Sequence, residues 1–177
     1  MPALVAAVHG RREDKGEAYM PEGLIFGRMK TGEENYVSDF VSGVFKKYVA
    51  PDYPKHGINE FMSFIKPQNL LERIQKEGHF IITAKDDNKI VGVIGIRDMH
   101  HISLLFVDEK YQGKGIGKKL ISLALEKILI QDECTKELTV YSSPYAKEIY
   151  KKMGFTQDGP KQEKNGIIFI PLRMELK

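Results

Sequence analysis

The sequence of 177 residues predicts an α+β domain in which a mostly antiparallel, twisted sheet of six to seven strands lies between about four helices, in three layers. Three observations predict this class. Apolar side chains recur over residues 37–48 with the 3.6-residue period of a helix. Residues 80–107 have the pattern of three successive strands, and strands joined by a short turn pair antiparallel. Residues 118–176 alternate between helix and strand, which places helices on the sheet.

We expect the domain to span residues 24–177, because residues 1–23 show no clear period and form an appendage of unknown role. A first strand is expected at residues 24–29. Thr31 and Glu34 have the spacing of a capping box and predict the start of the first helix.

Prolines divide the helical region that follows. Pro51 and Pro54 end the first helix, since proline lacks an N–H group and disfavours helical backbone in the residue before it. A second helix is expected over residues 59–77, and Pro67 is the candidate for a break within it.

The three central strands are expected at residues 80–84, 90–96 and 101–107. The first two form a hairpin, because Asp86-Asp87-Asn88-Lys89 is a polar turn between two apolar runs. The third strand leads directly into a glycine-rich segment.

Two more helices and two more strands alternate along the rest of the chain, at residues 118–130, 138–141, 143–154 and 167–176. Ser143 and Pro144 suit the N-cap and the first position of the helix that they open. Asn165-Gly166 predicts a turn before the last strand. Pro171 within that strand predicts an edge position or a bulge, since proline cannot donate to a neighbouring strand.

Composition indicates an ordinary globular protein, with 42% hydrophobic and 29% charged residues. The net charge of +3 is too balanced to predict nucleic-acid binding. No apolar run is long enough to span a membrane, and the short apolar stretch at residues 1–8 lacks the basic segment of a signal peptide. Cys134 is the only cysteine, so we expect a half-buried thiol and a cytoplasmic location.

The glycine-rich segment, here called the glycine loop, comprises residues 112–118 and lies between a strand and a helix. Glycines let the backbone approach a phosphate closely, and a helix N-terminus presents unpaired N–H groups along a favourable dipole. Lys110 and Lys119 add positive charge on either side. The segment therefore predicts an anion-binding site.

The spacing within the loop argues against two common phosphate sites. A nucleotide P-loop needs glycine five residues before Gly117, where Gln112 stands, and serine or threonine in place of Lys119. A dinucleotide-binding loop needs glycine in place of Lys118, and it opens a parallel βαβ unit rather than following a hairpin.

The pattern Gln-x-x-Gly-x-Gly at residues 112–117 instead resembles that of the GNAT N-acetyltransferase superfamily. A second resemblance lies downstream, in a helix with alanine and tyrosine that closes in Gly-Phe: Ala146, Tyr150, Gly154 and Phe155. The similar segments run from about residue 80 to residue 155. The resemblance implies a GNAT-like fold and acetyl-coenzyme A (acetyl-CoA) as the acetyl donor.

The resemblance also implies the residues that hold this cofactor. The pantetheine arm would bind to the backbone of Leu105, Phe106 and Val107. The pyrophosphate would lie against Gln112, Gly113, Lys114, Gly115, Ile116, Gly117 and Lys118. The helix of the second motif would complete the site through Ser143, Ala146 and Tyr150. Ser143 stands where the family often has asparagine.

Acetyl transfer requires a neutral amine, a polarised thioester carbonyl and a proton for the departing sulfur. The backbone N–H groups of residues 105–107 are candidates for polarising the carbonyl. The resemblance implies Tyr150 as the proton donor to the sulfur. The alternative is a core tyrosine whose hydroxyl is satisfied by a protein partner.

His101 lies eleven residues before Gln112, where several family members have a catalytic base. Strand alternation places His101 on one face with Ser103, Leu105 and Val107. A histidine base predicts an acid limb of turnover near pH ~6.5. The alternative is a strand-end histidine bonded to the backbone.

We therefore predict an acyltransferase that moves the acetyl group of acetyl-CoA to a primary amine, preferably of a small metabolite, by direct attack in a ternary complex. The alternatives are a protein lysine or N-terminal acetyltransferase and a non-catalytic acyl-CoA-binding regulator. The acceptor site is expected within residues 36–64 and 158–165. We expect no metal, nucleic acid or membrane partner. A homodimer is possible, and the sequence does not decide it.

Overall fold

The computed structural model describes residues 6–7 and 20–177. Residues 1–5 and 8–19 of the predicted appendage lie outside the described residues. The strands are β1 (Ala6–Ala7), β2 (Ile25–Arg28), β3 (Phe80–Asp86), β4 (Lys89–Arg97), β5 (His101–Val107), β6 (Glu137–Ser142), β7 (Thr156–Gln157), β8 (Gln162–Lys164) and β9 (Ile167–Glu175). The α-helices are α1 (Glu34–Tyr48), α2 (Lys55–Phe64), α3 (Pro67–Ile74), α4 (Ile116–Gln131) and α5 (Lys147–Lys152). Two short 3-10 helices are η1 (Ala50–Asp52) and η2 (Glu109–Tyr111).

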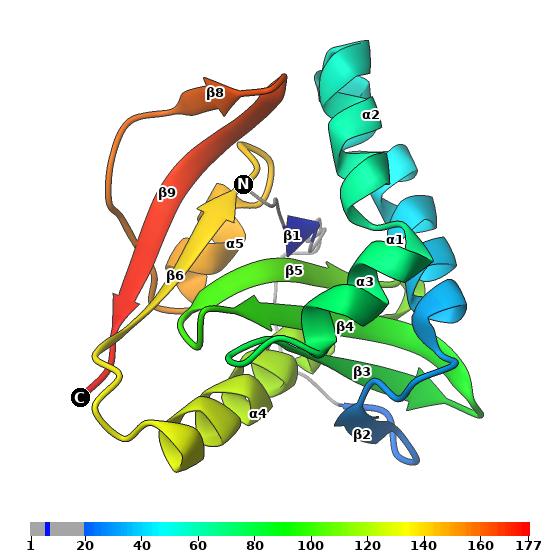
Figure 1. Ribbon diagram of the computed structural model, residues 1–177. Coiled ribbons are helices and arrows are strands. Elements are labelled where there is room, and N and C mark those ends of the chain that lie inside the picture. The colour runs from blue at the N-terminus through cyan, green and yellow to red at the C-terminus, as the bar shows by residue number, and fades with distance from the viewer. Residues whose placement is uncertain (1–5, 8–19) are drawn as a thin grey trace.

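In this part of the chain the main path of the sheet runs β2-β3-β4-β5-β6-β9-β7, with β1 beside β5 and β8 beside β9 (Figure 1). Strand pairs are antiparallel, except that β5 is parallel to both β1 and β6. Helix α4 makes the crossover from β5 to β6 that a parallel pair requires. The predicted fold class is confirmed. The described residues contain nine strands rather than the expected six to seven, because the short strands β1, β7 and β8 add to the sheet, and the break at Pro67 gives one helix more than the expected four.

Two hydrophobic cores lie on opposite faces of the sheet. The α1-side core joins the sheet to α1, α2 and α3, and in it Phe45 and Phe61 stack with ring centroids 3.9 Å apart. The α4-side core joins the other face to α4 and α5. Leu120, Ala124 and Ile128 are fully buried at one-turn spacing, which confirms the amphipathic pattern of α4. None of the described helices combines the length and the apolar character needed to cross a bilayer.

Both predicted turns join antiparallel strands. Asp87 and Asn88 connect β3 to β4 with φ angles of 44° and 67°. Asn165 and Gly166 connect β8 to β9 with φ angles of 53° and 77°. Two consecutive residues with positive φ match the right-handed twist of the paired strands, which is why Asn and Gly favour such turns.

The predicted capping box at the start of α1 is wrong. The N-cap is Glu33 rather than Thr31, and it makes no side-chain cap. The Glu33 carboxylate instead accepts from the backbone N–H of Lys30 at 2.8 Å, and Glu34 accepts from Gly32 at 2.7 Å. These two carboxylates stabilise the turn before the helix in place of the predicted box.

Helix α5 begins later than predicted. Ser143 and Pro144 belong to a turn, and the helix starts at Lys147 with Ala146 as its N-cap. The Ser143 hydroxyl still accepts from the Ala146 N–H at 3.2 Å, so it caps this turn rather than the helix.

The prediction of an edge or a bulge at Pro171 is wrong. Strand β9 lies inside the sheet, and its register with β6 is regular through the pair of Tyr141 with Pro171. On its other side, β9 pairs with β7 at Leu172 and Arg173 and with β8 at residues 167–169. Pro171 lies between these two short partners, where a missing N–H donor is tolerated.

Cys134 is exposed rather than half-buried. It lies in the turn after α4, where its backbone N–H donates to Asp132 at 3.0 Å. The turn is polar, so the thiol has no core to join.

Candidate active site

Strand β5 pairs with β6 only at its own first two residues, which lie opposite the middle of β6. His101 pairs with Thr139 and Ile102 with Val140, and the two strands then diverge (Figure 1). Backbone N–H and C=O groups are obligatory hydrogen-bonding groups. The divergence therefore leaves the edge of β5 at residues 105–107 for a partner other than β6.

Strand β1 occupies part of that edge. Ala6 pairs with Leu105 and Ala7 with Phe106, in parallel register. These are two of the residues whose backbone is expected to bind the pantetheine arm. One backbone edge cannot pair with two partners at once, so β1 and an arm bound there would exclude each other.

The glycine loop turns from η2 into α4. Gly113 and Gly115 have φ angles of 72° and 81°, in the left-handed region that favours glycine. Gly115 is the N-cap of α4, which has no side-chain cap and no acidic residue in its first turn. The N–H groups and the dipole of α4 therefore favour an anion at this end. A Cβ atom on Gly113 would meet nothing within 4 Å, so the outer side of the loop is open.

Side chains tie the loop to neighbouring strands. The Gln112 amide donates to the carbonyl of Val107 at 2.9 Å, which joins the start of the loop to the end of β5. The Tyr111 hydroxyl donates to Asp86 at the end of β3. The loop is thus held in place before any ligand binds, which reduces the entropy cost of binding.

Positive charge predominates around the loop. Glu109 forms an ion pair with Lys47 of α1, so its charge is compensated. The Lys114 ammonium lies 5.2 Å from the centroid of the Tyr111 ring. Three further lysines form no ion pair within the described residues: Lys110, Lys118 and Lys119. Charge and helix dipole together fit the pyrophosphate of coenzyme A.

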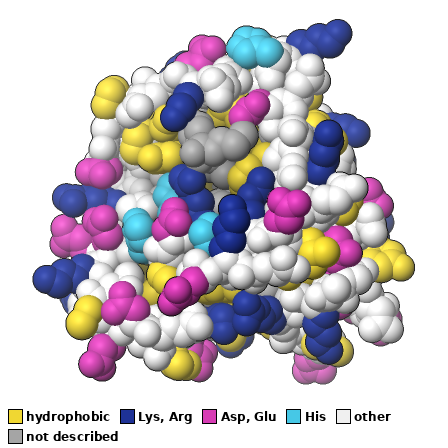
Figure 2. Space-filling view, viewed as in Figure 1, with side chains coloured by type: hydrophobic (Ala, Val, Ile, Leu, Met, Phe, Trp, Pro, Cys, Tyr) yellow, Lys and Arg dark blue, Asp and Glu magenta, His cyan; other side chains and the backbone are white. Residues whose placement is uncertain are grey.

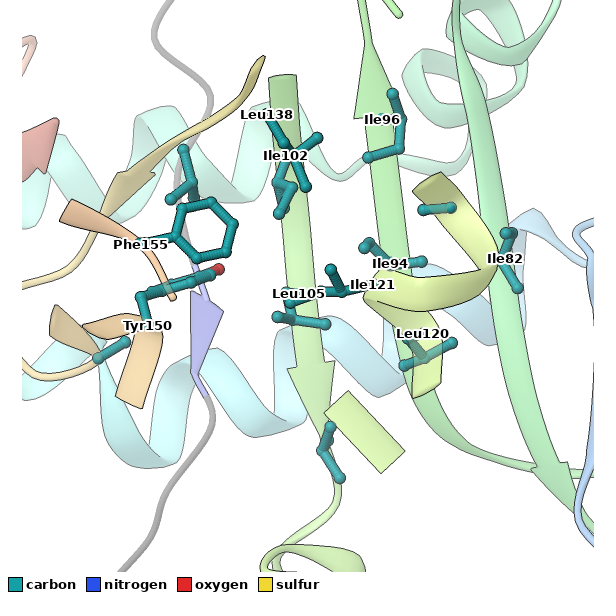
Figure 3. Close-up of a cluster of buried hydrophobic side chains, with 14 of the residues drawn as sticks. Ile82, Ile94, Ile96, Ile102, Leu105, Leu120, Ile121, Leu138, Tyr150 and Phe155 are labelled. Carbon is teal, nitrogen blue, oxygen red and sulfur yellow. The ribbon is translucent and has the colours of Figure 1, made fainter. Parts of the chain in front are cut away.

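The Tyr150 hydroxyl is buried without a hydrogen-bond partner among the described residues. The ring packs edge-on against Phe155, with centroids 5.1 Å apart. Figure 3 shows the hydroxyl pointing from α5 toward β5, where Leu105 lies. An unsatisfied buried hydroxyl costs about 1–3 kcal/mol, so the position fits a ligand that would accept its hydrogen bond. Burial raises the pKa of Tyr150 well above 10, which keeps the proton on the oxygen.

Ser143 and Ala146 lie buried at the base of α5, in the same turn. The Ser142 hydroxyl donates to the Ser143 carbonyl at 2.7 Å, and the Ser143 hydroxyl accepts from Ala146. The Ser143 side chain thus orders the turn that precedes α5, the helix that carries Tyr150. A contact of Ser143 with the pantetheine arm stays a prediction.

A β-bulge at Ser103 changes the face on which His101 lies. Gly95 pairs with Leu104 but Ile96 pairs with Ile102, so Ser103 is an extra residue in β5. Ile102 consequently joins the α4-side core, and Leu104 lies in the α1-side core.

The predicted face of His101, shared with Leu105 and Val107, is therefore wrong. These two residues belong to the α4-side core. His101 packs its ring against Tyr141, centroids 4.6 Å apart, and Tyr141 packs on the α1-side core. His100 precedes the strand and is exposed, with its Nδ1 2.6 Å from the carbonyl oxygen of Asp98.

The His101 ring has one hydrogen-bond partner among the described side chains. Its Nδ1 lies 2.8 Å from the Thr139 hydroxyl. In the tautomer in which Nδ1–H donates to this hydroxyl, Nε2 carries the lone pair. Nε2 is buried without a partner among the described residues. Burial, then the charges of Arg97 and His100, lower the pKa of His101 to about 3, so an acid limb near 6.5 cannot come from this ring.

Two arginines near this end of β5 were missed by sequence reasoning. Arg73 of α3 and Arg97 of β4 line one cavity, and Arg97 also lies 6.0 Å from the centroid of the Tyr141 ring. An arginine in a helix or at a strand end usually marks a solvated surface. The sequence therefore contains no signal that Arg73 and Arg97 line the same cavity. Within the described residues, no group of three or more His, Cys, Asp and Glu side chains could hold a metal ion.

The described site thus combines an anion-binding loop, a strand edge that β6 does not cover and a buried hydroxyl without a partner among the described residues. A family model described as an acetyltransferase (GNAT) domain matches residues 49–176. Because this match covers more than half of the sequence, the chain belongs to the GNAT acetyltransferase family.

Several crystal structures have the same fold. A GCN5-related N-acetyltransferase from Rhodopseudomonas palustris is 21% identical with a TM-score of 0.73, and the match covers 91% of this chain and 100% of that one. The PaiA N-acetyltransferase from Thermoplasma acidophilum, solved with coenzyme A, is 16% identical with a TM-score of 0.72, over 87% and 99% of the two chains. A spermidine N-acetyltransferase from Vibrio cholerae, solved with coenzyme A and spermine, is 14% identical with a TM-score of 0.60, over 88% and 96%.

Proposed function

We propose that the protein transfers the acetyl group of acetyl-CoA to a primary amine of a small molecule. The observation that carries this proposal is the buried Tyr150 hydroxyl, which has no partner among the described residues and points toward β5, where Leu105 lies. A core tyrosine would satisfy its hydroxyl within the protein. A hydroxyl held ready for a ligand is instead what a proton donor requires.

The described residues fit coenzyme A in three places. The backbone of residues 112–118 and the start of α4 would hold the pyrophosphate, with the neighbouring lysines adding charge. The edge of β5 at residues 105–107 would pair with the amide groups of the pantetheine arm once β1 has left it. Tyr150 would hydrogen-bond the sulfur. When bound, acetyl-CoA supplies the acetyl group as an activated thioester.

The chain's own residues would then perform two tasks. The Tyr150 hydroxyl keeps its proton at neutral pH, because burial raises its pKa, and would donate that proton to the departing sulfur. A backbone N–H of β5 would polarise the thioester carbonyl, as an oxyanion-hole donor does.

His101 is the candidate for removing a proton from the amine. Its Nε2 would carry the lone pair in the tautomer that donates from Nδ1 to Thr139, and a pKa of about 3 makes it a weak base in this structure. The same apolar environment would lower the pKa of a cationic amine placed close to Nε2. Transfer of the proton from the amine to His101 would then be easier.

Release of coenzyme A in the presence of a panel of amines tests the proposal. The panel includes spermidine and spermine, amino acids, aminoglycosides and a lysine-containing peptide. We expect steady release that depends on one small amine and on acetyl-CoA together. Release with the peptide alone would favour a protein acetyltransferase. Binding of acetyl-CoA without release for any amine would favour a regulator.

A further inference from the structure

A cavity of about 520 Å³ lies between α3 and the ends of β3, β4 and β5. Its volume is in the range of small-molecule sites. We call it the arginine pocket and define it by Arg73, Arg97, Ser103 and Leu104, all of which line it. Figure 2, in the same view as Figure 1, shows Lys, Arg and His side chains among carboxylates over the ends of β4 and β5.

The Arg73 guanidinium is half-buried and held in a fixed orientation. Its Cζ atom lies 3.4 Å from the centroid of the Phe64 ring, and its Nη1 donates to the Phe64 carbonyl at 2.7 Å. Within the described residues Arg73 forms no ion pair with a carboxylate. A guanidinium has five N–H donors, so most of its capacity is left for a ligand.

A second positive charge lies close to the first. Burial, followed by the charge of Arg97, lowers the pKa of Arg73 to about 10. Both half-buried guanidinium groups thus place their positive charge in one cavity, which favours binding of an anion there. Glu72 and Asp98 also line the cavity, but both are exposed at its rim, where solvent screens their charges.

The arginine pocket adjoins the expected position of the thioester. Ser103 and Leu104 form part of its wall and directly precede the edge of β5 at residues 105–107. Arg97 reaches toward Tyr141, which packs against His101. A molecule whose anionic group occupies the pocket could therefore extend its other end toward this edge and His101.

We propose that the arginine pocket binds an anionic group of the acceptor, so that the preferred acceptor is a primary amine that also carries a carboxylate or a phosphate. This inference rests on the proposed function, because it concerns the second substrate of the same reaction. Arginine suits such a site, since its planar donors match carboxylate and phosphate oxygens in pairs.

Matched acceptors test the inference in the full chain. Glycine is compared with glycinamide, lysine with lysinamide, and phosphoethanolamine with ethanolamine, by release of coenzyme A from acetyl-CoA. We expect kcat/KM to favour the anionic member of at least one pair by about 10- to 100-fold, the effect of one or two charge-assisted hydrogen bonds. The first two pairs report a carboxylate and the third a phosphate.

Substitutions connect the preference to the pocket. Arg97→Gln should raise KM for the anionic acceptor by about 10- to 100-fold relative to KM for its neutral partner, with acetyl-CoA affinity near normal. Arg73→Gln should act in the same direction, and it provides a second test if Arg97→Gln does not fold. Lys66→Gln is the control, because it removes an exposed positive charge beside α3 and outside the pocket.

Direct titration of the same pairs into the protein saturated with coenzyme A measures the preference without turnover. Stronger binding of the anionic member supports the inference even if no amine is acetylated. The absence of acetylation would contradict the proposed function but not the inference about the pocket. Equal use and equal binding of both members of every pair would overturn the inference, while amine-dependent release of coenzyme A would leave the proposed function intact. An anionic preference that persists in both arginine variants would also overturn it.

Discussion

At its carboxyl end β5 leads into the glycine loop, whereas at its amino end it meets side chains from α3, β4 and β6. The first region presents mainly backbone groups: a strand edge, a left-handed turn and the start of α4. The second presents side chains, namely His101, Tyr141 and the two arginines of the pocket.

This difference separates two kinds of recognition. Backbone groups at the carboxyl end suit the invariant parts of a cofactor, since their geometry depends little on which side chains are present. Side chains at the amino end can change with the acceptor while the fold stays the same. A substitution at the carboxyl end of β5 should therefore affect cofactor affinity. A substitution at the amino end should affect acceptor selection and turnover.

The largest expected effect concerns Tyr150, which lies between the two regions. Tyr150→Phe should reduce turnover by about one to three orders of magnitude, because the proton donor is lost. Its free energy of unfolding should stay the same or rise, since the hydroxyl has no described partner to lose. Steady-state kinetics and urea unfolding measure the two effects. A less stable variant with normal turnover would assign the hydroxyl to the core instead.

The second effect distinguishes the two histidines at the amino end. His101→Ala should lower turnover by about two orders of magnitude with acetyl-CoA affinity near normal, whereas His100→Ala should be mild because its ring is exposed. With a pKa of about 3, His101 should not itself produce an acid limb in turnover at neutral pH. If both variants retain the wild-type rate, a water chain or an acceptor-side carboxylate is the better candidate for the base.

A smaller effect, on acetyl-CoA affinity, tests whether β1 and the pantetheine arm compete for the edge of β5 at its carboxyl end. The double variant Ala6→Pro/Ala7→Pro removes backbone donors from β1 and should weaken its pairing. Acetyl-CoA affinity should then increase about fivefold, the equivalent of one ordinary hydrogen bond. Ala6→Ser/Ala7→Ser is the matched control, since it keeps the backbone donors. Equal affinity in both double variants would show that β1 does not compete with the arm.

A separate effect, on folding rather than on activity, is a change in the pH dependence of stability. His101 is neutral in the folded protein down to a pKa of about 3, but it titrates near ~6.5 when unfolded. The unfolded state binds more protons between these values, so stability should fall as pH decreases from about 6.5, by at most about 1.4 kcal/mol per pH unit from this group. The slope should be shallower in His101→Gln, as measured by urea unfolding at several pH values. Parallel slopes would contradict the burial of a neutral ring.

The carboxyl end could be predicted from the sequence because its parts are contiguous. The strand, the glycine loop and the start of α4 follow one another, so spacing alone defines their order. Tyr150 could be predicted only through resemblance, and its unsatisfied hydroxyl is a property of packing that no spacing shows.

The amino end could not be predicted for two physical reasons. The bulge at Ser103 reverses the strand alternation, so the face inferred for His101 was the wrong one. The arginine pocket brings Arg73 and Arg97 together only through the path of α3 back to the sheet. The proximity of residues that are distant in the sequence depends on tertiary packing rather than on a local pattern.

The measurement that tests the central claim most directly is a calorimetric titration of acetyl-CoA into the wild-type protein, Gly115→Val and Gly23→Val. Gly115 and Gly23 have similar φ angles of 81° and 86°, so valine introduces comparable backbone strain at both. Only Gly115 belongs to the glycine loop. We expect binding by the wild type and by Gly23→Val, and at least about 100-fold weaker binding by folded Gly115→Val, as the loss of two backbone hydrogen bonds to a phosphate would cause. Unchanged affinity in folded Gly115→Val would contradict the assignment of the cofactor site.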